Sequence, residues 1–110
     1  MAFNQLSARE IELLALLMEE AGEIVQAAGK VLRHGWTMTY PAGGRSNREK
    51  LEAEIGHLMV AVDLLARVES PVDRQMCLSQ HFIGRSCAEK AATVGEWLHE
   101  QSAPAGEAWP

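Results

Sequence analysis

Three glutamates, Glu19, Glu20 and Glu23, stand close together in an otherwise apolar stretch of the chain. Residues three and four apart are neighbours on a helix surface, so a helix here would project these carboxylates from one side. Residues 13–18 before them are all apolar, and the nearest basic residue is Lys30. Like charges at this spacing repel, more strongly when partly buried. A divalent cation would supply the missing positive charge, and the pattern therefore favours a metal site over a solvated acidic face.

A second group of candidate ligands follows at Glu54 and His57, which are three residues apart and therefore share one face of a helix. Carboxylate oxygens suit Mg²⁺, whereas imidazole is a poor Mg²⁺ ligand and suits Mn²⁺, Co²⁺ or Zn²⁺ better. Spacing alone leaves two interpretations of His57 open: a metal ligand, or an ordinary half-buried histidine.

Basic residues follow the glutamates on the same predicted helix, at Lys30, Arg33 and His34. Cations near the C-terminus of a helix stabilise its dipole, which explains part of their presence. They are also candidates for binding phosphate groups that a metal does not reach, with Arg48 as a weaker candidate. Trp36 could stack on a planar ligand or cover the core.

The elements that position these residues are predicted to be helices. Three capping boxes begin at Ser7, Ser46 and Ser86, each with a glutamate three residues later. A fourth start follows Ser70, where Pro71 suits the first helical position. These signals predict helices near residues 7–34, 47–69, 71–83 and 86–101. We expect a single domain over residues 1–101 and a flexible tail over residues 102–110.

Apolar residues on the first predicted helix cover more of its surface than one partner helix can bury. One seam alternates steps of three and four residues, as in antiparallel bundles; it consists of Ile11, Leu14, Met18, Ala21, Val25, Ala28 and Leu32. Leu13, Leu16 and Leu17 lie off that seam. The excess predicts burial on several sides, with contacts from another subunit.

The composition excludes several classes of function. The 110 residues carry a formal net charge of −5 without a basic stripe, which argues against nucleic acid as a partner. No apolar run is long enough to span a bilayer, and no signal peptide is indicated. Cys77 and Cys87 form no C-x-x-C pair, which is typical of buried thiols in a reducing compartment. We expect a cytoplasmic protein that does not bind membranes.

Two motifs resemble those of a known family. The run MEEAGEIVQAAGKVLRHG at residues 18–35 contains E-E-x-x-E, and Glu54-Ile55-Gly56-His57 stands in a second helical run. Together with the loop and Asn47-Arg48, they resemble the all-α nucleoside triphosphate pyrophosphatases, in particular the short MazG-like forms found in phages. The resemblance covers residues 14–65. The family has E-x-x-D in the second motif, so His57 departs from the pattern.

The resemblance implies an all-α, four-helix-type bundle completed by homodimerisation, as a dimer or a dimer of dimers. It implies a pyrophosphohydrolase that converts a (deoxy)nucleoside triphosphate, such as dGTP or GTP, to the monophosphate and pyrophosphate with Mg²⁺ or Mn²⁺. Phosphoribosyl-ATP pyrophosphatase and dimeric dUTPases share this fold and remain alternatives within the enzyme class. Another alternative is a non-catalytic nucleotide-binding or dimerisation module that lost turnover through the change at His57.

The residue roles that follow fall into three sets. The catalytic residues would be Glu19, Glu20, Glu23 and Glu54, and the metal ligands would be Glu20, Glu23, Glu54 and His57. Substrate would be bound by Lys30, Arg33, His34, Trp36, Asn47 and Arg48.

Overall fold

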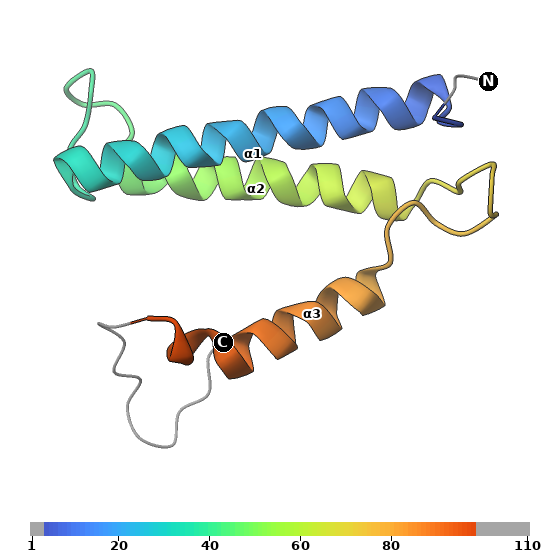
Figure 1. Ribbon diagram of the computed structural model, residues 1–110. Coiled ribbons are helices and arrows are strands. Elements are labelled where there is room, and N and C mark those ends of the chain that lie inside the picture. The colour runs from blue at the N-terminus through green and yellow to red at the C-terminus, as the bar shows by residue number, and fades with distance from the viewer. Residues whose placement is uncertain (1–3, 99–110) are drawn as a thin grey trace. The chain divides into compact units, whose positions relative to one another are not determined.

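A computed structural model describes residues 4–98 of the chain. The described residues contain three α-helices and one short 3₁₀ helix: α1 (Ala8–His34), α2 (Asn47–Ala66), α3 (Gln80–Thr93) and η1 (Val94–Glu96) (Figure 1). Two isolated β-bridges, Thr39–Ser46 and Glu69–Met76, are the only strand-like pairings within residues 4–98. The predicted all-α class is confirmed. The chain divides into two compact units, Met1–Cys77 and Leu78–Pro110.

Helix α1 begins and ends where its sequence signals indicate. The Ser7 Oγ accepts a hydrogen bond from the Glu10 backbone N–H at 3.1 Å, and the Ser7 N–H donates to Glu10 Oε1 at 2.9 Å. This reciprocal pair satisfies two of the N–H groups that a helix start leaves unbonded. The helix ends at Gly35, whose φ of 82° is readily adopted only by glycine.

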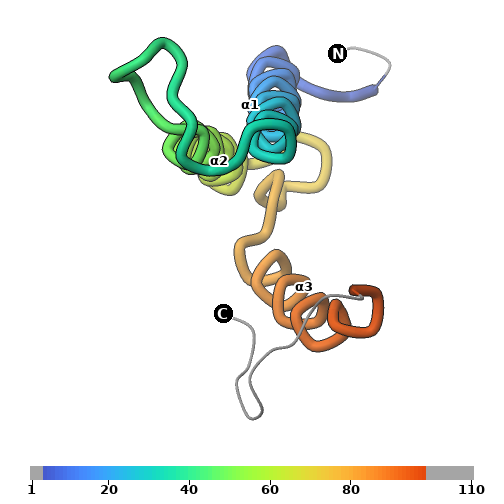
Figure 2. The backbone as a smooth tube through the Cα atoms, turned by 90° about the vertical axis from the view of Figure 1, so that its left-hand side faces the viewer, coloured from blue at the N-terminus to red at the C-terminus, as the bar shows by residue number. Residues whose placement is uncertain are grey.

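Helix α2 starts in the same way and runs back antiparallel to α1 (Figures 1 and 2). The Ser46 Oγ accepts from the Glu49 N–H at 3.1 Å, and the Ser46 N–H donates to Glu49 Oε1 at 2.9 Å. Buried apolar residues of this unit are Ala27, Ala61 and Leu65. Small alanines at these points let the two helices approach closely. The first two predicted helices are confirmed, although α2 ends at Ala66 and not at residue 69.

The loop between α1 and α2 is tied to the start of α2. The backbone N–H of Asn47 donates to the Met38 carbonyl at 2.9 Å, and that of Arg48 donates to the Trp36 carbonyl at 3.0 Å. The buried side chain of Asn47 donates from Nδ2 to the Gly35 carbonyl at 3.1 Å. These bonds fix the loop next to the C-terminal end of α1, where the basic residues lie.

The prediction of separate helices at residues 71–83 and 86–101 was wrong. Residues 71–79 form turns and one β-bridge, and a single helix, α3, begins after Ser79 and passes through Ser86 without a break. Two local features stop a helix from starting at Pro71. Asp73 Oδ1 accepts from the Gln75 backbone N–H at 3.0 Å, a local bond that competes with helix formation. Arg74 has a φ of 64°, outside the right-handed helical region.

Within the first unit, the turn segment is held to the start of α1 and to the end of α2 through Cys77. The Cys77 Sγ lies 3.5 Å from Glu10 Oε2 as a hydrogen-bond donor, and the Cys77 backbone N–H donates to the Val68 carbonyl at 2.8 Å. Burial raises the pKa of the Cys77 thiol, which keeps it protonated. Glu10 is buried although charged, and these bonds together with the Ser7 cap account for its place.

Helix α3 and η1 belong to the second unit. Ser79 caps α3 by accepting from the Phe82 N–H at 3.1 Å, and none of the α3 residues is buried. The end of the predicted fourth helix, residues 99–101, and the predicted tail, residues 102–110, lie outside the described residues. Within residues 4–98, no helix has the length and apolar character needed to cross a membrane.

The face of α1 that packs in the hairpin differs from the predicted seam. Glu10 and Ala27 are buried on α1, and Leu13, Leu17, Glu20, Ile24 and Val31 are half-buried at helical spacing with them. Of the predicted seam, Leu14 and Ala28 are also half-buried, whereas Ile11, Met18, Val25 and Leu32 are exposed. Both faces carry apolar residues at helical spacing, and the packed one includes two glutamates. Hydrophobic periodicity alone therefore did not identify the face of α1 that packs against α2.

Candidate metal and anion site

Four predicted metal ligands lie together across the two helices of the hairpin. Glu20 and Glu23 extend from α1, and Glu54 and His57 extend from α2. One ligand atom from each residue lies within 4.8 Å of the corresponding atoms of the others. The i,i+3 spacing within each helix turns both pairs toward the helix interface. The juxtaposition predicted from two separate motifs is therefore present in the structure.

Two carboxylate oxygens in this cluster are buried without a hydrogen-bond donor. They are Oε2 of Glu20 and Oε2 of Glu54, whose side chains are only 13% and 23% exposed. The Nδ1 atom of His57 lies 3.5 Å from the first and 3.4 Å from the second, but forms a hydrogen bond with neither. Buried charged oxygens without partners are costly, because their desolvation is not offset.

The third carboxylate of the cluster, that of Glu23, has a pKa shifted by its neighbours. A shared hydrogen bond with Glu54, together with the negative charge of that residue and partial burial, raises the pKa of Glu23 above its ordinary value. Glu20 and His57 act in the opposite direction but do not outweigh Glu54. Either a proton or a cation therefore stabilises the cluster.

The residues present fit a divalent cation. Three carboxylates supply hard oxygen ligands, which Mg²⁺ and Mn²⁺ prefer, and the two unpartnered oxygens are available for coordination. The imidazole of His57 suits Mn²⁺ better than Mg²⁺. Glu19, predicted as catalytic, is exposed and lies outside this group of four.

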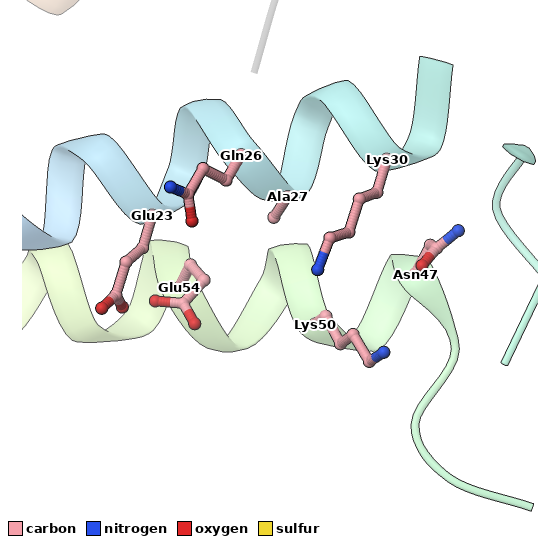
Figure 3. Close-up of a pocket in the computed structure, with 7 residues that line it drawn as sticks. All are labelled: Glu23, Gln26, Ala27, Lys30, Asn47, Lys50 and Glu54. Carbon is pink, nitrogen blue, oxygen red and sulfur yellow. The ribbon is translucent and has the colours of Figure 1, made fainter. Parts of the chain in front are cut away.

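A cleft of about 250 Å³ continues from the cluster along the groove between α1 and α2. Figure 3 shows the carboxylates of Glu23 and Glu54 close together at one end, with Lys30 reaching from α1 toward α2. Its lining consists of Glu23, Gln26, Ala27, Lys30, Asn47, Lys50 and Glu54. The cleft therefore runs from negative to positive side chains within one short groove.

A second cleft of about 300 Å³ adjoins the first and is more apolar. The two share Lys30, Asn47 and Lys50, and the second adds Arg33, His34, Met38 and Tyr40. Cationic groups thus lie between the acidic cluster and an apolar, partly aromatic surface contributed by the loop.

Three of the predicted substrate-binding residues, Lys30, Arg33 and His34, line these clefts. Asn47 lines both, although its side-chain amide is already bonded to the Gly35 carbonyl and also has a structural role. Trp36 and Arg48 line neither cleft. The Arg48 guanidinium lies 5.5 Å from the centre of the Trp36 ring, so these two side chains stack on each other.

Five lining residues were not predicted from the sequence: Gln26, Ala27, Met38, Tyr40 and Lys50. Lys50 could have been found, because it precedes Glu54 by four residues and so shares its helix face. Its Nζ donates to the Tyr40 carbonyl at 2.9 Å, which joins α2 to the loop. Met38 and Tyr40 lie in an irregular loop, where no periodicity indicates which side chains face inward.

Comparison with known proteins identifies no relative: no family model, no curated protein and no solved structure matches this chain.

Proposed function

We propose that this protein hydrolyses a nucleoside triphosphate to the monophosphate and pyrophosphate with the help of a divalent cation. The observation that carries the proposal is the order of chemistry along one groove. An acidic cluster with two unpartnered buried oxygens is followed by cationic side chains and then by an apolar, aromatic surface. A metal–triphosphate needs the acidic cluster and the cationic side chains, and a nucleoside needs the apolar, aromatic surface. The two sequence motifs give independent support.

In this arrangement the cation would be held by Glu20, Glu23, Glu54 and His57. When bound, it would neutralise phosphate charge and help to activate water for attack. Carboxylate oxygens not engaged by it can accept the proton that the attacking water releases. The net reaction breaks one bond between the α and β phosphates and consumes one water, which divides between the two products.

The lysines set the position of the triphosphate. Lys30 and Lys50 come from different helices and line both clefts, so they can bind phosphate oxygens from two sides. Arg33 and His34 extend the positive surface toward the loop. Holding the phosphates at two points orients the reacting bond relative to the acidic cluster, which is a large part of catalysis in phosphoryl transfer.

The nucleoside is then directed toward Met38 and Tyr40. An aromatic ring and a thioether offer an apolar surface on which a base can stack. Trp36 is engaged with Arg48 and lies outside both clefts. We therefore assign base contact to Tyr40 in place of Trp36. A purine nucleotide such as dGTP or GTP offers the larger stacking surface and is the first substrate to test.

One observation favours a second candidate function, a nucleotide-binding module without turnover. His57 Nδ1 faces both unpartnered oxygens, at 3.5 and 3.4 Å. A protonated imidazole there would itself supply positive charge between Glu20 and Glu54. Part of the negative charge of the cluster would then be offset without a metal, and the protein would bind a nucleotide through its cationic cleft alone.

A panel of ribo- and deoxyribonucleoside triphosphates, each with Mg²⁺ or Mn²⁺, separates the two functions. The proposed enzyme releases pyrophosphate and the monophosphate in equal amounts, faster with Mn²⁺ than with Mg²⁺. Release of orthophosphate and a diphosphate would reject the proposed bond cleavage. Nucleotide binding without any product in either metal would favour the non-catalytic module.

A further inference from the structure

The tip of the loop between α1 and α2, residues 40–45, is held to the hairpin by one side chain. The Nζ atom of Lys50 donates a hydrogen bond to the Tyr40 carbonyl at 2.9 Å. Within the part of the chain that the structure describes, this is the one hydrogen bond that joins the tip to a helix. The backbone bonds from α2 reach the loop before the tip begins, at Trp36 and Met38. The position of Tyr40 therefore depends on Lys50.

The side chain of Tyr40 has little packing of its own to fix it. It is 82% exposed, although it lines the apolar cleft. A side chain with so few buried contacts is held mainly through its backbone. Lys50 is half-buried on α2, lines the same cleft and supplies the backbone anchor. The anchor therefore keeps the aromatic ring beside the cleft.

Lys50 can hold the Tyr40 carbonyl and a phosphate group at the same time. An ammonium group has three N–H donors, and the carbonyl takes one of them. Two donors and the positive charge remain for an anion in the cleft that Lys50 shares with Lys30. Figure 3 shows the two lysines entering this cleft from different helices, Lys30 from α1 and Lys50 from α2. Of the two ammonium groups, that of Lys50 is bonded to the loop.

We propose that Lys50 is a positioning residue that couples phosphate binding to base contact, so that the site favours a ligand with both a phosphate chain and a base. The inference rests on the nucleotide assignment of the proposed function but does not require turnover. A phosphate bound to Lys50 fixes the ammonium group, and the fixed ammonium group holds Tyr40 where the base stacks. Within the described residues Lys30 has no hydrogen bond to the loop, so it contributes to phosphate binding alone.

Two variants separate this coupling from a simple loss of positive charge. Lys50→Met and Lys30→Met each replace an ammonium group of the same cleft by an unbranched side chain that suits a helix, so both should keep the circular dichroism of the parent. Lys50→Met also removes the bond to the Tyr40 carbonyl, whereas Lys30→Met leaves it in place. Lys50→Arg keeps a positive charge and N–H donors, and it is the conservative variant that should restore the coupling.

Isothermal titration calorimetry with Mn²⁺ measures the binding of guanosine 5′-(α,β-methylene)triphosphate, a nucleotide whose α–β link cannot be hydrolysed. Tyr40→Leu should weaken this binding at least about fivefold in the parent, because a stacked base contributes that much or more. In Lys30→Met and Lys50→Arg the same change should again cost about fivefold or more, but in Lys50→Met less than about twofold. Inorganic tripolyphosphate, which has no base, should bind equally well with and without Tyr40→Leu.

The possible results distinguish this inference from the proposed function. An equal effect of Tyr40→Leu in Lys50→Met and in Lys30→Met would overturn the coupling and leave the proposed function standing. A parent protein that does not bind the nucleotide analogue would overturn both. The expected coupling in a protein that never hydrolyses GTP would support the role of Lys50 and reject the proposed enzyme.

Discussion

Negative charge is concentrated in a small space between α1 and α2. Glu20, Glu23 and Glu54 bring three carboxylates within 4.8 Å of one another, and His57 is the only basic group in the cluster. The lysines that could offset this charge line the neighbouring cleft instead. At the residue scale, therefore, the carboxylate cluster lacks a compensating cation, and the lysines of the neighbouring cleft are available to bind an anion.

The metal-free protein should lose stability as the pH rises above about 4.5, the ordinary pKa of glutamate. Because Glu54 raises the pKa of folded Glu23, the folded state binds more protons than the unfolded state in this window. The free energy of unfolding contributed by this group is then fully present below pH 4.5 and falls as the pH rises through the folded-state pKa. Urea unfolding in the presence of a chelator should show this fall in the free energy of unfolding, and the Glu23→Gln substitution should remove it.

The two capping boxes make the free energy of unfolding depend on pH in the opposite direction. Hydrogen bonds from the backbone N–H groups of Ser7 and Ser46 lower the pKa of Glu10 and Glu49. The stabilisation that ionised Glu10 and Glu49 contribute is present above pH 4.5, and it is lost as the pH falls through their lowered folded-state pKa values. The parent profile should therefore have a maximum near the ordinary glutamate pKa. Identical parent and Glu23→Gln profiles above that pH would contradict the assignment.

Tyr40→Leu should weaken nucleotide binding more than Trp36→Leu. Stacking of a base on an aromatic ring is worth about 1–3 kcal/mol, so KM should rise about fivefold to a hundredfold while kcat changes little. Trp36 stacks on Arg48 away from both clefts, and its replacement should leave KM within about twofold. Steady-state kinetics on both variants test this. A larger effect at Trp36 would return base contact to the residue first predicted from the sequence.

At the element scale, serine caps decide where the helices begin. The serines that actually cap are Ser7, Ser46 and Ser79, whereas Ser86 lies inside α3 despite its capping-box sequence. Sequence reasoning predicted α1 and α2 because each box is followed by a long helical pattern. It failed in the region of residues 70–86, where local turn bonds around Asp73 outweighed the signal from Pro71 and the helix began at a serine without a glutamate partner.

Ser46→Ala and Ser86→Ala test this difference with the same chemical change. Ser46→Ala removes a cap bond to the Glu49 N–H and should lower the free energy of unfolding by about 1 kcal/mol. Ser86→Ala replaces an exposed helix-interior residue by the best helix former and should be neutral or slightly stabilising. Urea unfolding followed by circular dichroism measures both. Equal destabilisation would mean that Ser86 is a cap after all.

At the scale of the hairpin, α1 presents two different surfaces. One bears the acidic cluster and the clefts, and another bears the exposed residues of the predicted seam, from Ile11 to Leu32. The sequence predicted which four side chains lie together, because the i,i+3 spacing within each helix sets their direction. It also placed Glu19 with them, four residues before Glu23, and Glu19 lies outside the cluster. It did not predict which apolar face would pack, because that choice depends on how α2 lies against α1. The predicted contacts with another subunit rested on apolar residues that lie off the seam, namely Leu13, Leu16 and Leu17, and these are half-buried in the structure.

The most direct test of the proposed enzyme is the rate of pyrophosphate release by Glu54→Gln beside that of Glu52→Gln, with nucleoside triphosphate and Mn²⁺. Both changes remove one carboxylate from α2, but Glu54 is in the cluster and Glu52 is exposed outside it. A charged group that stabilises the transition state contributes several kcal/mol, so Glu54→Gln should be slower than the parent by about a hundredfold or more. Glu52→Gln should keep the parent rate. Equal rates in the two variants would contradict the assignment of this cluster as the catalytic metal site.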